Sequence, residues 1–141
     1  MTEAQLLEGK AIGQKIRQEL SLEIGRIKAA DGTSPSLHCV IVGADPASES
    51  YLRAQEKTAL GLGLGFKAHR FPAEIPERGL IDGLRSLNAA PDVHGIIIQM
   101  PLPAGIDPSR VTDALDPRKD VEGVHPTSLG LMVLRKARLI P

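Results

Sequence analysis

Aromatic side chains are nearly missing from this sequence, which has no tryptophan, one tyrosine and two phenylalanines in 141 residues. Proteins that bind single-stranded nucleic acid stack the bases on aromatic rings, so this composition excludes a base-stacking surface. An excess of positive charge is missing too, because 17 basic residues balance 17 acidic ones. We therefore expect no nucleic-acid partner and no attraction to an acidic membrane surface.

Cysteine and long apolar runs are equally scarce. Cys39 is the one cysteine, which excludes an internal disulfide and suits a reducing, cytoplasmic compartment. It lies in an apolar run, where we expect a small core residue rather than a nucleophile. No apolar run reaches the length that spans a bilayer, and no signal peptide precedes the first polar helix. We therefore expect a cytoplasmic protein with no membrane partner.

What the sequence does contain is a regular alternation of helix and strand patterns, within a length that fits one domain. Helices alternating with strands predict an α/β fold, here a three-layer α/β/α domain whose mostly parallel sheet is covered by helices on both faces. The pattern alone also allows an unrelated flavodoxin-like module. The predicted helices are 9–30, 46–63, 78–89, 107–116 and 127–137, and the predicted strands are 37–43, 66–71 and 94–100.

Three polar loops follow predicted strands or lie near the end of the chain. They come after Val42, after Ile98 and around Asp120. Ligands of parallel sheets collect at the carboxyl ends of the strands, so these loops are expected to converge on one composite pocket.

Gly61, Gly63 and Gly65 allow two interpretations. A dinucleotide loop needs glycines directly after a strand and before a helix, where backbone N–H groups meet the pyrophosphate. These glycines instead follow a helical pattern and precede a strand, which favours a helix stop. We therefore expect no NADP or NAD site, and no bound cofactor, in this chain alone.

Two polar side chains of the predicted pocket stand out. Tyr51 and Gln55 lie four residues apart on a helix and therefore project together. Tyr51 is either an ordinary surface tyrosine or a ring that stacks on a planar ligand. Gln99 ends a buried strand, where it is either half-exposed or directed at a ligand. Pro101 and Pro103 follow it and would stiffen a pocket wall.

The segment "KDVEGVHP" carries Asp120 and Glu122 beside Gly123. Acidic residues in a loop are either simply solvated or turned toward a ligand. Their spacing from His125 does not match a metal site, so we expect no metal.

Together these segments resemble a known enzyme family. The stretches "VGADPASESYLRAQEK", "GIIIQMPLPAGID" and "DPRKDVEGVHP", with the opening "LLEGKAIGQKIRQEL", are similar to signature segments of bifunctional methylenetetrahydrofolate dehydrogenase/cyclohydrolase. The resemblance implies an N-terminal folate-binding catalytic domain, followed in the family by a Rossmann domain that binds NADP or NAD. It implies a homodimer in one-carbon metabolism and purine biosynthesis. Members oxidise methylenetetrahydrofolate to the methenyl form and hydrolyse that to 10-formyltetrahydrofolate.

The resemblance also implies roles for individual residues. Tyr51 would lie against the folate, and Gln55 occupies the position of the family's catalytic lysine. Gln99 would position that catalytic side chain and the folate. Glu122 stands where the family has an aspartate that grips the amino-pyrimidine edge of the pterin. The adjoining residues assigned to the folate site are Pro101 and Leu102.

Gln55 is the departure with the largest chemical consequence. General acid–base help is worth roughly 10² to 10⁴ in rate, and a glutamine amide does not titrate in the useful range. The resemblance therefore implies either a folate-binding catalytic domain with altered activity or an inactive paralogue that serves as a folate-binding or dimerisation module. It divides the chain into a folate-binding domain, 1–125, and a connecting segment, 126–141, toward a Rossmann domain absent from this chain. Dehydrogenase activity is not expected without that domain.

Overall fold

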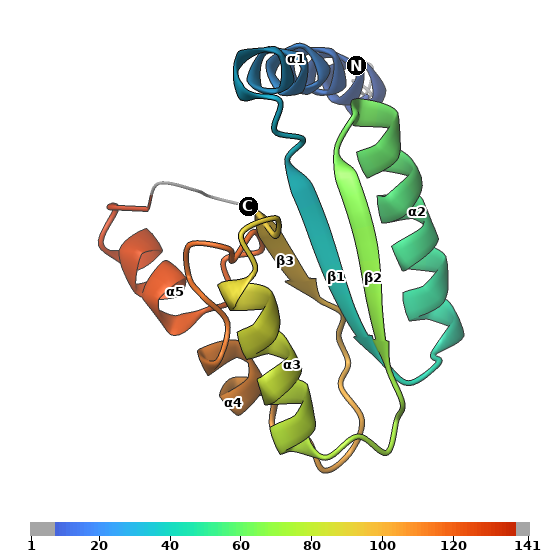
Figure 1. The fold of residues 1–141 in the computed structure, drawn as a ribbon, viewed down its shortest axis with the longest axis vertical. Helices are drawn as coiled ribbons and strands as arrows, with labels where there is room; N and C mark the ends of the chain where they lie inside the picture. The colour runs from blue at the N-terminus through green and yellow to red at the C-terminus, as the bar shows by residue number, and fades with distance from the viewer. Residues whose placement is uncertain (1–7, 138–141) are drawn as a thin grey trace, which may run out of the picture.

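Three parallel strands form the centre of the molecule (Figure 1). In the computed structural model, which describes residues 8–137, β1 (Ser36–Val42) lies between β2 (Gly65–Phe71) and β3 (Gly95–Ile98). Val40 of β1 is opposite His69 of β2 and Ile98 of β3. Because every pair is parallel, the three strands end at the same edge of the sheet.

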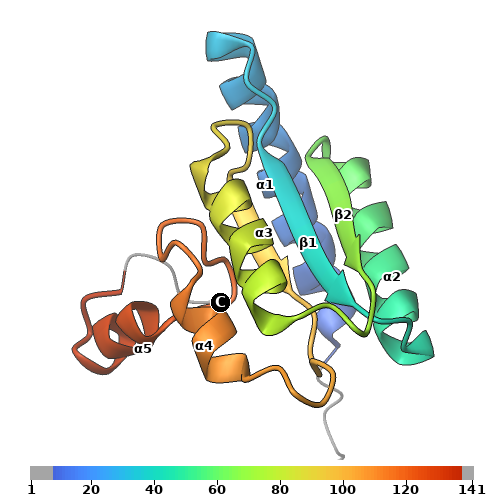
Figure 2. The ribbon, with the colours of Figure 1, turned by 60° about the horizontal axis from the view of Figure 1, so that its bottom comes forward.

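Helices flank both faces of this sheet (Figure 2). α3 lies on one face and α2 on the other, whereas α1 lies beyond the edge where β1 begins and contacts α2 (Figure 1). The long helices are α1 (Gly9–Asp31), α2 (Pro46–Leu62) and α3 (Glu77–Ala89), and the short ones are α4 (Pro108–Asp113) and α5 (Pro126–Val133). The predicted α/β architecture and each predicted helix and strand are therefore confirmed, with ends that differ by a few residues.

The alternation of side chains along β1 divides the core between the two faces. Val40 and Val42 pack with the apolar side of α3, whose buried leucines recur at helical spacing. Cys39 and Ile41 point the other way and pack with Leu52 of α2. Cys39 is fully buried, as expected of a core residue.

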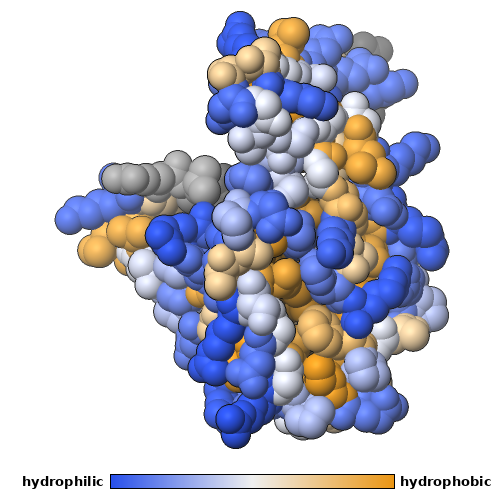
Figure 3. Space-filling view, in the orientation of Figure 1, coloured by the Kyte–Doolittle hydropathy of each residue, from blue (hydrophilic) through white to orange (hydrophobic). Residues whose placement is uncertain are grey.

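α1 departs from this pattern, because Ile24 is its one buried residue within the described part of the chain. The other apolar side chains on the same face as Ile24 remain exposed: Ile12, Ile16, Leu20 and Ile27. Apolar surface is also visible between α3 and α2 (Figure 3). Helical periodicity therefore predicted the helix itself but not the burial of its apolar stripe.

The three glycines at the end of α2 are structural. Gly61 lies in the last turn, Gly63 ends the helix at φ 91°, and Gly65 begins β2. The positive φ of Gly63 is the left-handed conformation that favours glycine at a helix end. Among residues 8–137, no helix has both the length and the apolar character needed to cross a membrane.

Candidate ligand-binding site

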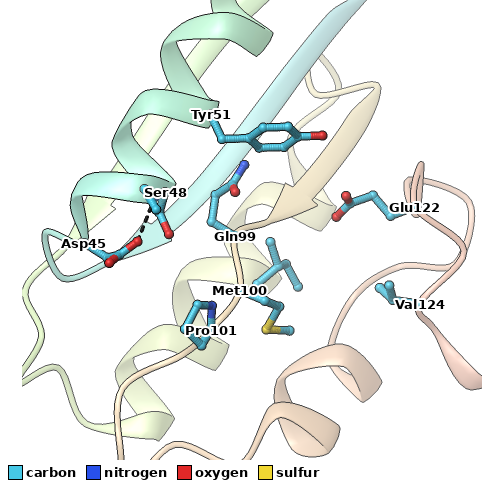
Figure 4. Close-up of a pocket in the computed structure, with 10 residues that line it drawn as sticks. Asp45, Ser48, Tyr51, Gln99, Met100, Pro101, Glu122 and Val124 are labelled. Atoms are coloured by element: carbon cyan, nitrogen blue, oxygen red, sulfur yellow. Dashed lines mark hydrogen bonds between the residues drawn. The ribbon is translucent and has the colours of Figure 1, made fainter.

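A cavity of about 530 Å³ opens where the strands end (Figure 4). Its walls come from the first turns of α2, from the end of β3 with the residues that follow it, and from the loop 120–124. These are the three segments that the sequence predicted to converge. A larger cavity, about 630 Å³, lies beside α5; Asp120 and Gly123 line it, but Tyr51, Gln99 and Glu122 do not.

The start of α2 is held in place by its cap. The Asp45 side chain accepts a hydrogen bond from the Ser48 backbone N–H at 2.8 Å, and Pro46 occupies the first turn. The hydrogen bond from Ser48 lowers the pKa of the Asp45 carboxyl, so this group is ionised at neutral pH. The capped turn presents Tyr51 to the cavity.

Tyr51 lies over the cavity with its ring free to contact a ligand. Its side chain is 59% exposed, and Figure 4 shows the ring extending over the cavity above Gln99. Tyr51 also borders a second groove of about 370 Å³ along α2, which Gln55 lines. An exposed ring on a cavity wall is suited to stacking on a flat ligand.

Gln99 is buried and connects the cavity to Gln55. It is 7% exposed, and its Nε2 donates to the Gln55 Oε1 at 2.7 Å and to the Cys39 Sγ at 3.3 Å. The half-exposed alternative for Gln99 is therefore wrong. Burial raises the pKa of the Cys39 thiol, which keeps it neutral beside the two amides. Gln55 does not line this cavity; it lines the neighbouring groove and contacts the cavity through Gln99, so its role in the site stays a prediction.

Asp120 anchors the loop that forms the third wall. Its side chain is buried, and its two carboxylate oxygens accept from the backbone N–H groups of Val124 at 3.2 Å and His125 at 2.9 Å. The residue also pairs with Ile96 in a parallel bridge beside β3. Burial raises the pKa of Asp120, but hydrogen bonds from His125, Ser128 and Val124 outweigh it and lower the pKa overall. The solvated alternative for this carboxylate is therefore wrong.

Glu122 projects from this loop into the cavity, across from Tyr51 (Figure 4). Gly123 follows it at φ 66°, a conformation that favours glycine, so the turn beyond the carboxylate depends on this residue. Burial raises the pKa of Glu122, and the negative charge of Asp120 raises it further. One carboxylate of the loop is thus held ionised, while the other titrates closer to neutral pH.

The structure adds residues that the sequence did not single out and moves one that it did. Met100 and Val124 both line the cavity with Pro101, and the Met100–Pro101 peptide is cis. Met100 and Val124 are direct neighbours of predicted site segments in the sequence ("QMP" and "GVH"), and this adjacency was the one signal that could have identified them. Leu102 instead packs against the core on the α3 side, so its contact with folate stays a prediction.

The described residues present neither a metal cluster nor, at the three glycines after α2, a phosphate loop. Residues 8–137 contain no group of three or more His, Cys, Asp or Glu side chains placed to hold a metal ion. Gly61, Gly63 and Gly65 end a helix and begin a strand, so they offer no phosphate loop. The cavity has instead a ring, a buried amide and a carboxylate, which suit a planar organic ligand with hydrogen-bonding edges.

Comparison with known proteins shows which family shares these features. The family described as "Tetrahydrofolate dehydrogenase/cyclohydrolase, catalytic domain" matches residues 7–122. A "Bifunctional protein FolD" from Rhodopseudomonas palustris is 42% identical over 138 residues, which is 98% of this chain and 47% of that protein. The chain thus spans about half the length of the curated relatives that it matches.

Solved structures give the same result. A methylenetetrahydrofolate dehydrogenase from the silkworm, Bombyx mori, superposes with a TM-score of 0.94 at 32% identity, over 99% of this chain and 48% of that one. A methylenetetrahydrofolate dehydrogenase-cyclohydrolase from Trypanosoma brucei, complexed with NADP cofactor and inhibitor, has a TM-score of 0.91 at 28% identity. The superposition covers 100% of this chain and 48% of the Trypanosoma brucei protein.

Proposed function

The chain belongs to the tetrahydrofolate dehydrogenase/cyclohydrolase family, and we propose that the cavity between α2, β3 and the loop 120–124 binds a tetrahydrofolate. The ligands in question are the methylene, methenyl and 10-formyl forms. The observation that carries this proposal is the meeting of Tyr51, Gln99 and Glu122 around one cavity, from three separate segments. Each of them offers a contact that a pterin ring can use.

In this proposal each of the three side chains contacts a different part of the ligand. The exposed ring of Tyr51 stacks on the flat pterin or on the ring that follows it. Glu122 accepts hydrogen bonds from the amino-pyrimidine edge, which presents N–H donors. Gln99 and Gln55 provide the amide groups beside the carbon unit that folate carries, and Pro101 with Leu102 extends the wall. Asp120 holds the loop in place through its hydrogen bonds to the backbone. The Glu122 side chain on that loop therefore loses little conformational entropy when the ligand binds.

Gln55 determines which chemistry the site can support. Hydrolysis of a methenyl group requires proton transfers around an attacking water, and neither Gln55 nor Gln99 titrates near neutral pH. We therefore propose slow cyclohydrolase turnover in this chain. The neutral amide pair at 2.7 Å also favours a second candidate, in which the chain is a paralogue that binds folate, or only dimerises, without turnover.

Oxidation of the methylene form requires a nicotinamide cofactor held against the folate. The Trypanosoma brucei relative was solved with NADP, whereas the described residues of this chain fit no dinucleotide loop. We propose that nucleotide binding belongs to the other half of the longer relatives, with residues 1–125 as the folate domain and 126–141 as the connection. A homodimer, a cytoplasmic location and a role in purine biosynthesis stay predictions.

Calorimetric titration of the chain with 10-formyltetrahydrofolate tests this function. The expected result is saturable binding at one site that weakens at least about tenfold in Tyr51→Ala, because the stacking surface is lost. Val133→Ala is the matched control, since Val133 is an exposed side chain on α5 and is not among the residues that line the cavity. Absence of binding, or equal binding by Tyr51→Ala, would contradict the proposal.

A further inference from the structure

Two grooves continue from the ligand-binding cavity along α2. The first, of about 370 Å³, shares Tyr51 with the cavity, and we call it the α2 groove. The second, also about 370 Å³, lies between α1 and α2, shares Thr58 and Leu62 with the first, and is called the α1–α2 groove. Figure 1 shows α2 running from the edge where the strands end toward α1. The cavity and the two grooves therefore form one continuous track.

The α2 groove is mainly apolar. Its apolar lining consists of Leu37, Ala54, Ala59, Leu62 and Leu64. Tyr51 stands at the end nearest the cavity, and the Thr58 hydroxyl donates to the Ala54 carbonyl at 2.9 Å. An aromatic ring in this groove would contact apolar surface beside the Tyr51 ring. The groove thus suits an uncharged ring better than an ionised group.

The α1–α2 groove is positively charged. Of the described residues that line it, only Arg17 and Lys57 carry a formal charge, and both are cations. Within residues 8–137, neither of them forms an ion pair. The charged residues that line the cavity at the other end of the track are the carboxylates Asp45 and Glu122. The track is therefore negative at one end, apolar in the middle and positive at the other end.

We propose that the α1–α2 groove binds the tail of a polyglutamylated tetrahydrofolate, and this inference rests on the folate-binding function proposed above. A folate carries its groups in the same order as the track. The pterin has N–H donors on its amino-pyrimidine edge, the benzoyl ring is apolar, and the glutamate tail is anionic. With the pterin in the cavity and the benzoyl ring in the α2 groove, the tail extends toward Arg17 and Lys57.

The length of the track determines how many glutamates the groove requires. Thr58 follows Tyr51 by seven residues, which places it about 10 Å farther along the helix. The first glutamate is bonded to the benzoyl group and therefore stays near the α2 groove. Each glutamate added through a γ-carboxyl contributes one more carboxylate and at least about 3.5 Å of length. The second and later glutamates are therefore the ones that contact the two cations.

The gain in affinity should be moderate, because Arg17 and Lys57 are both exposed. One ion pair between exposed side chains changes an affinity by up to about fivefold, so two pairs predict about tenfold tighter binding of a long tail. Salt screens exposed charges, and the gain should therefore shrink as the ionic strength rises. The affinity for a monoglutamate should show no such gain.

The experiment measures the dissociation constants of 10-formyltetrahydrofolate as the monoglutamate and as the pentaglutamate, by calorimetry in low and in high salt. The expected ratio in low salt is about tenfold in favour of the pentaglutamate. It should fall to near one in the double variant Arg17→Gln/Lys57→Gln, whose affinity for the monoglutamate should stay within about twofold of the unmodified chain. The matched control is Lys15→Gln/Lys28→Gln, which removes two positive charges from α1 but none from the groove, and should keep the ratio.

The outcomes separate the two proposals. Equal affinity for the two tail lengths in the unmodified chain would overturn the tail site and leave folate binding standing. A gain that persists in Arg17→Gln/Lys57→Gln, or that high salt leaves unchanged, would also overturn it. A gain that the control loses to the same extent would overturn it too, by assigning the effect to the overall charge of the helix. No binding of either folate would overturn the proposed function itself, and the tail site with it.

Discussion

The Nε2 of Gln99 lies 2.7 Å from the Oε1 of Gln55 and 3.3 Å from the Sγ of Cys39. This contact joins residues that are 44 positions apart and uses the acceptor of Gln55, which leaves the amide N–H groups of Gln55 available to a ligand. Neither amide has a group that titrates near neutral pH. The relationship therefore describes a site arranged for binding more than for proton transfer.

Restoring a titratable group at this position should restore chemistry. We expect Gln55→Lys to raise the hydrolysis of methenyltetrahydrofolate by roughly 10² to 10⁴ in kcat, because a lysine can move protons around the attacking water. Spectrophotometric hydrolysis assays measure this constant, with Gln55→Met as the uncharged control. Equal kcat in the lysine and glutamine forms would disprove this account of the position.

Asp120 should matter for stability as well as for binding. Asp120→Ala leaves the backbone N–H groups of Val124 and His125 without their acceptor, which should cost about 1–3 kcal/mol of unfolding free energy. Urea denaturation measures that loss, and folate titration measures the weakened hold on Glu122. Asp120→Asn is the matched variant, since it keeps a carbonyl acceptor and should lose less. Wild-type stability in Asp120→Ala would show that the loop does not need this anchor.

The affinity for a tetrahydrofolate should depend on pH through Glu122. Burial and the charge of Asp120 raise the pKa of Glu122, whereas the pKa of Asp120 is lowered. As the pH falls, Glu122 is therefore protonated before Asp120. The protonated acid accepts hydrogen bonds from the amino-pyrimidine edge less strongly, so the affinity should fall as pH decreases toward the raised pKa. Asp45 and Tyr51 also face this cavity, but the Asp45 pKa is lowered, so it remains ionised in this range. Folate titrations at several pH values should show an affinity that depends on pH in the unmodified chain and not in Glu122→Gln. The same pH profile in both proteins would assign the dependence to another group.

A pair of histidines far from the cavity should make the stability itself sensitive to pH. His38 Nδ1 and His69 Nε2 lie 2.9 Å apart, with the rings stacked. Burial lowers the pKa of His38, and His69 lowers it further; burial lowers the pKa of His69, and Lys67 adds to this. Among the neighbouring groups that act on His38, Asp92 opposes this shift and His94 adds to it.

The sign follows from proton binding. The unfolded histidines take up protons below about pH 6.5, while the folded pair resists them, so the unfolded state binds more protons. The contribution to stability is complete above pH 6.5 and is lost as pH falls toward the lowered pKa values. Urea denaturation between pH 7.5 and 5.5 should show this loss, and His69→Gln should reduce it. His125→Asn, which keeps a capping side chain on α5, is the control. Identical slopes in all three proteins would contradict the prediction.

The sequence predicted the elements and their order because local patterns determine them. The buried spacing of Leu80, Leu84 and Leu87 defines α3, and the apolar run at Ile96 defines β3. The composite cavity also followed from the rule that parallel strands end at one edge. In this way the convergence of the start of α2, the end of β3 and the loop around Asp120 was predicted from patterning alone.

Long-range contacts escaped that reasoning. The hydrogen bond between Gln55 and Gln99 depends on how α2 packs against β3, which no local pattern reports. Burial of Asp120 results from a bridge to Ile96 that joins a loop to a strand. Leu102 follows Gln99 by three residues but packs on the opposite side of the sheet from Leu52, since the chain turns after β3. The exposed stripe of α1 shows the same limit, because periodicity identifies an apolar face without its partner.

A crystal structure of the chain grown with 10-formyltetrahydrofolate tests the central claim most directly. The account predicts a pterin stacked near Tyr51, with its amino-pyrimidine edge on Glu122 and the formyl group beside Gln99. Folate bound instead in the larger cavity beside α5, which Arg118 and Lys136 line, would contradict the assignment of the site.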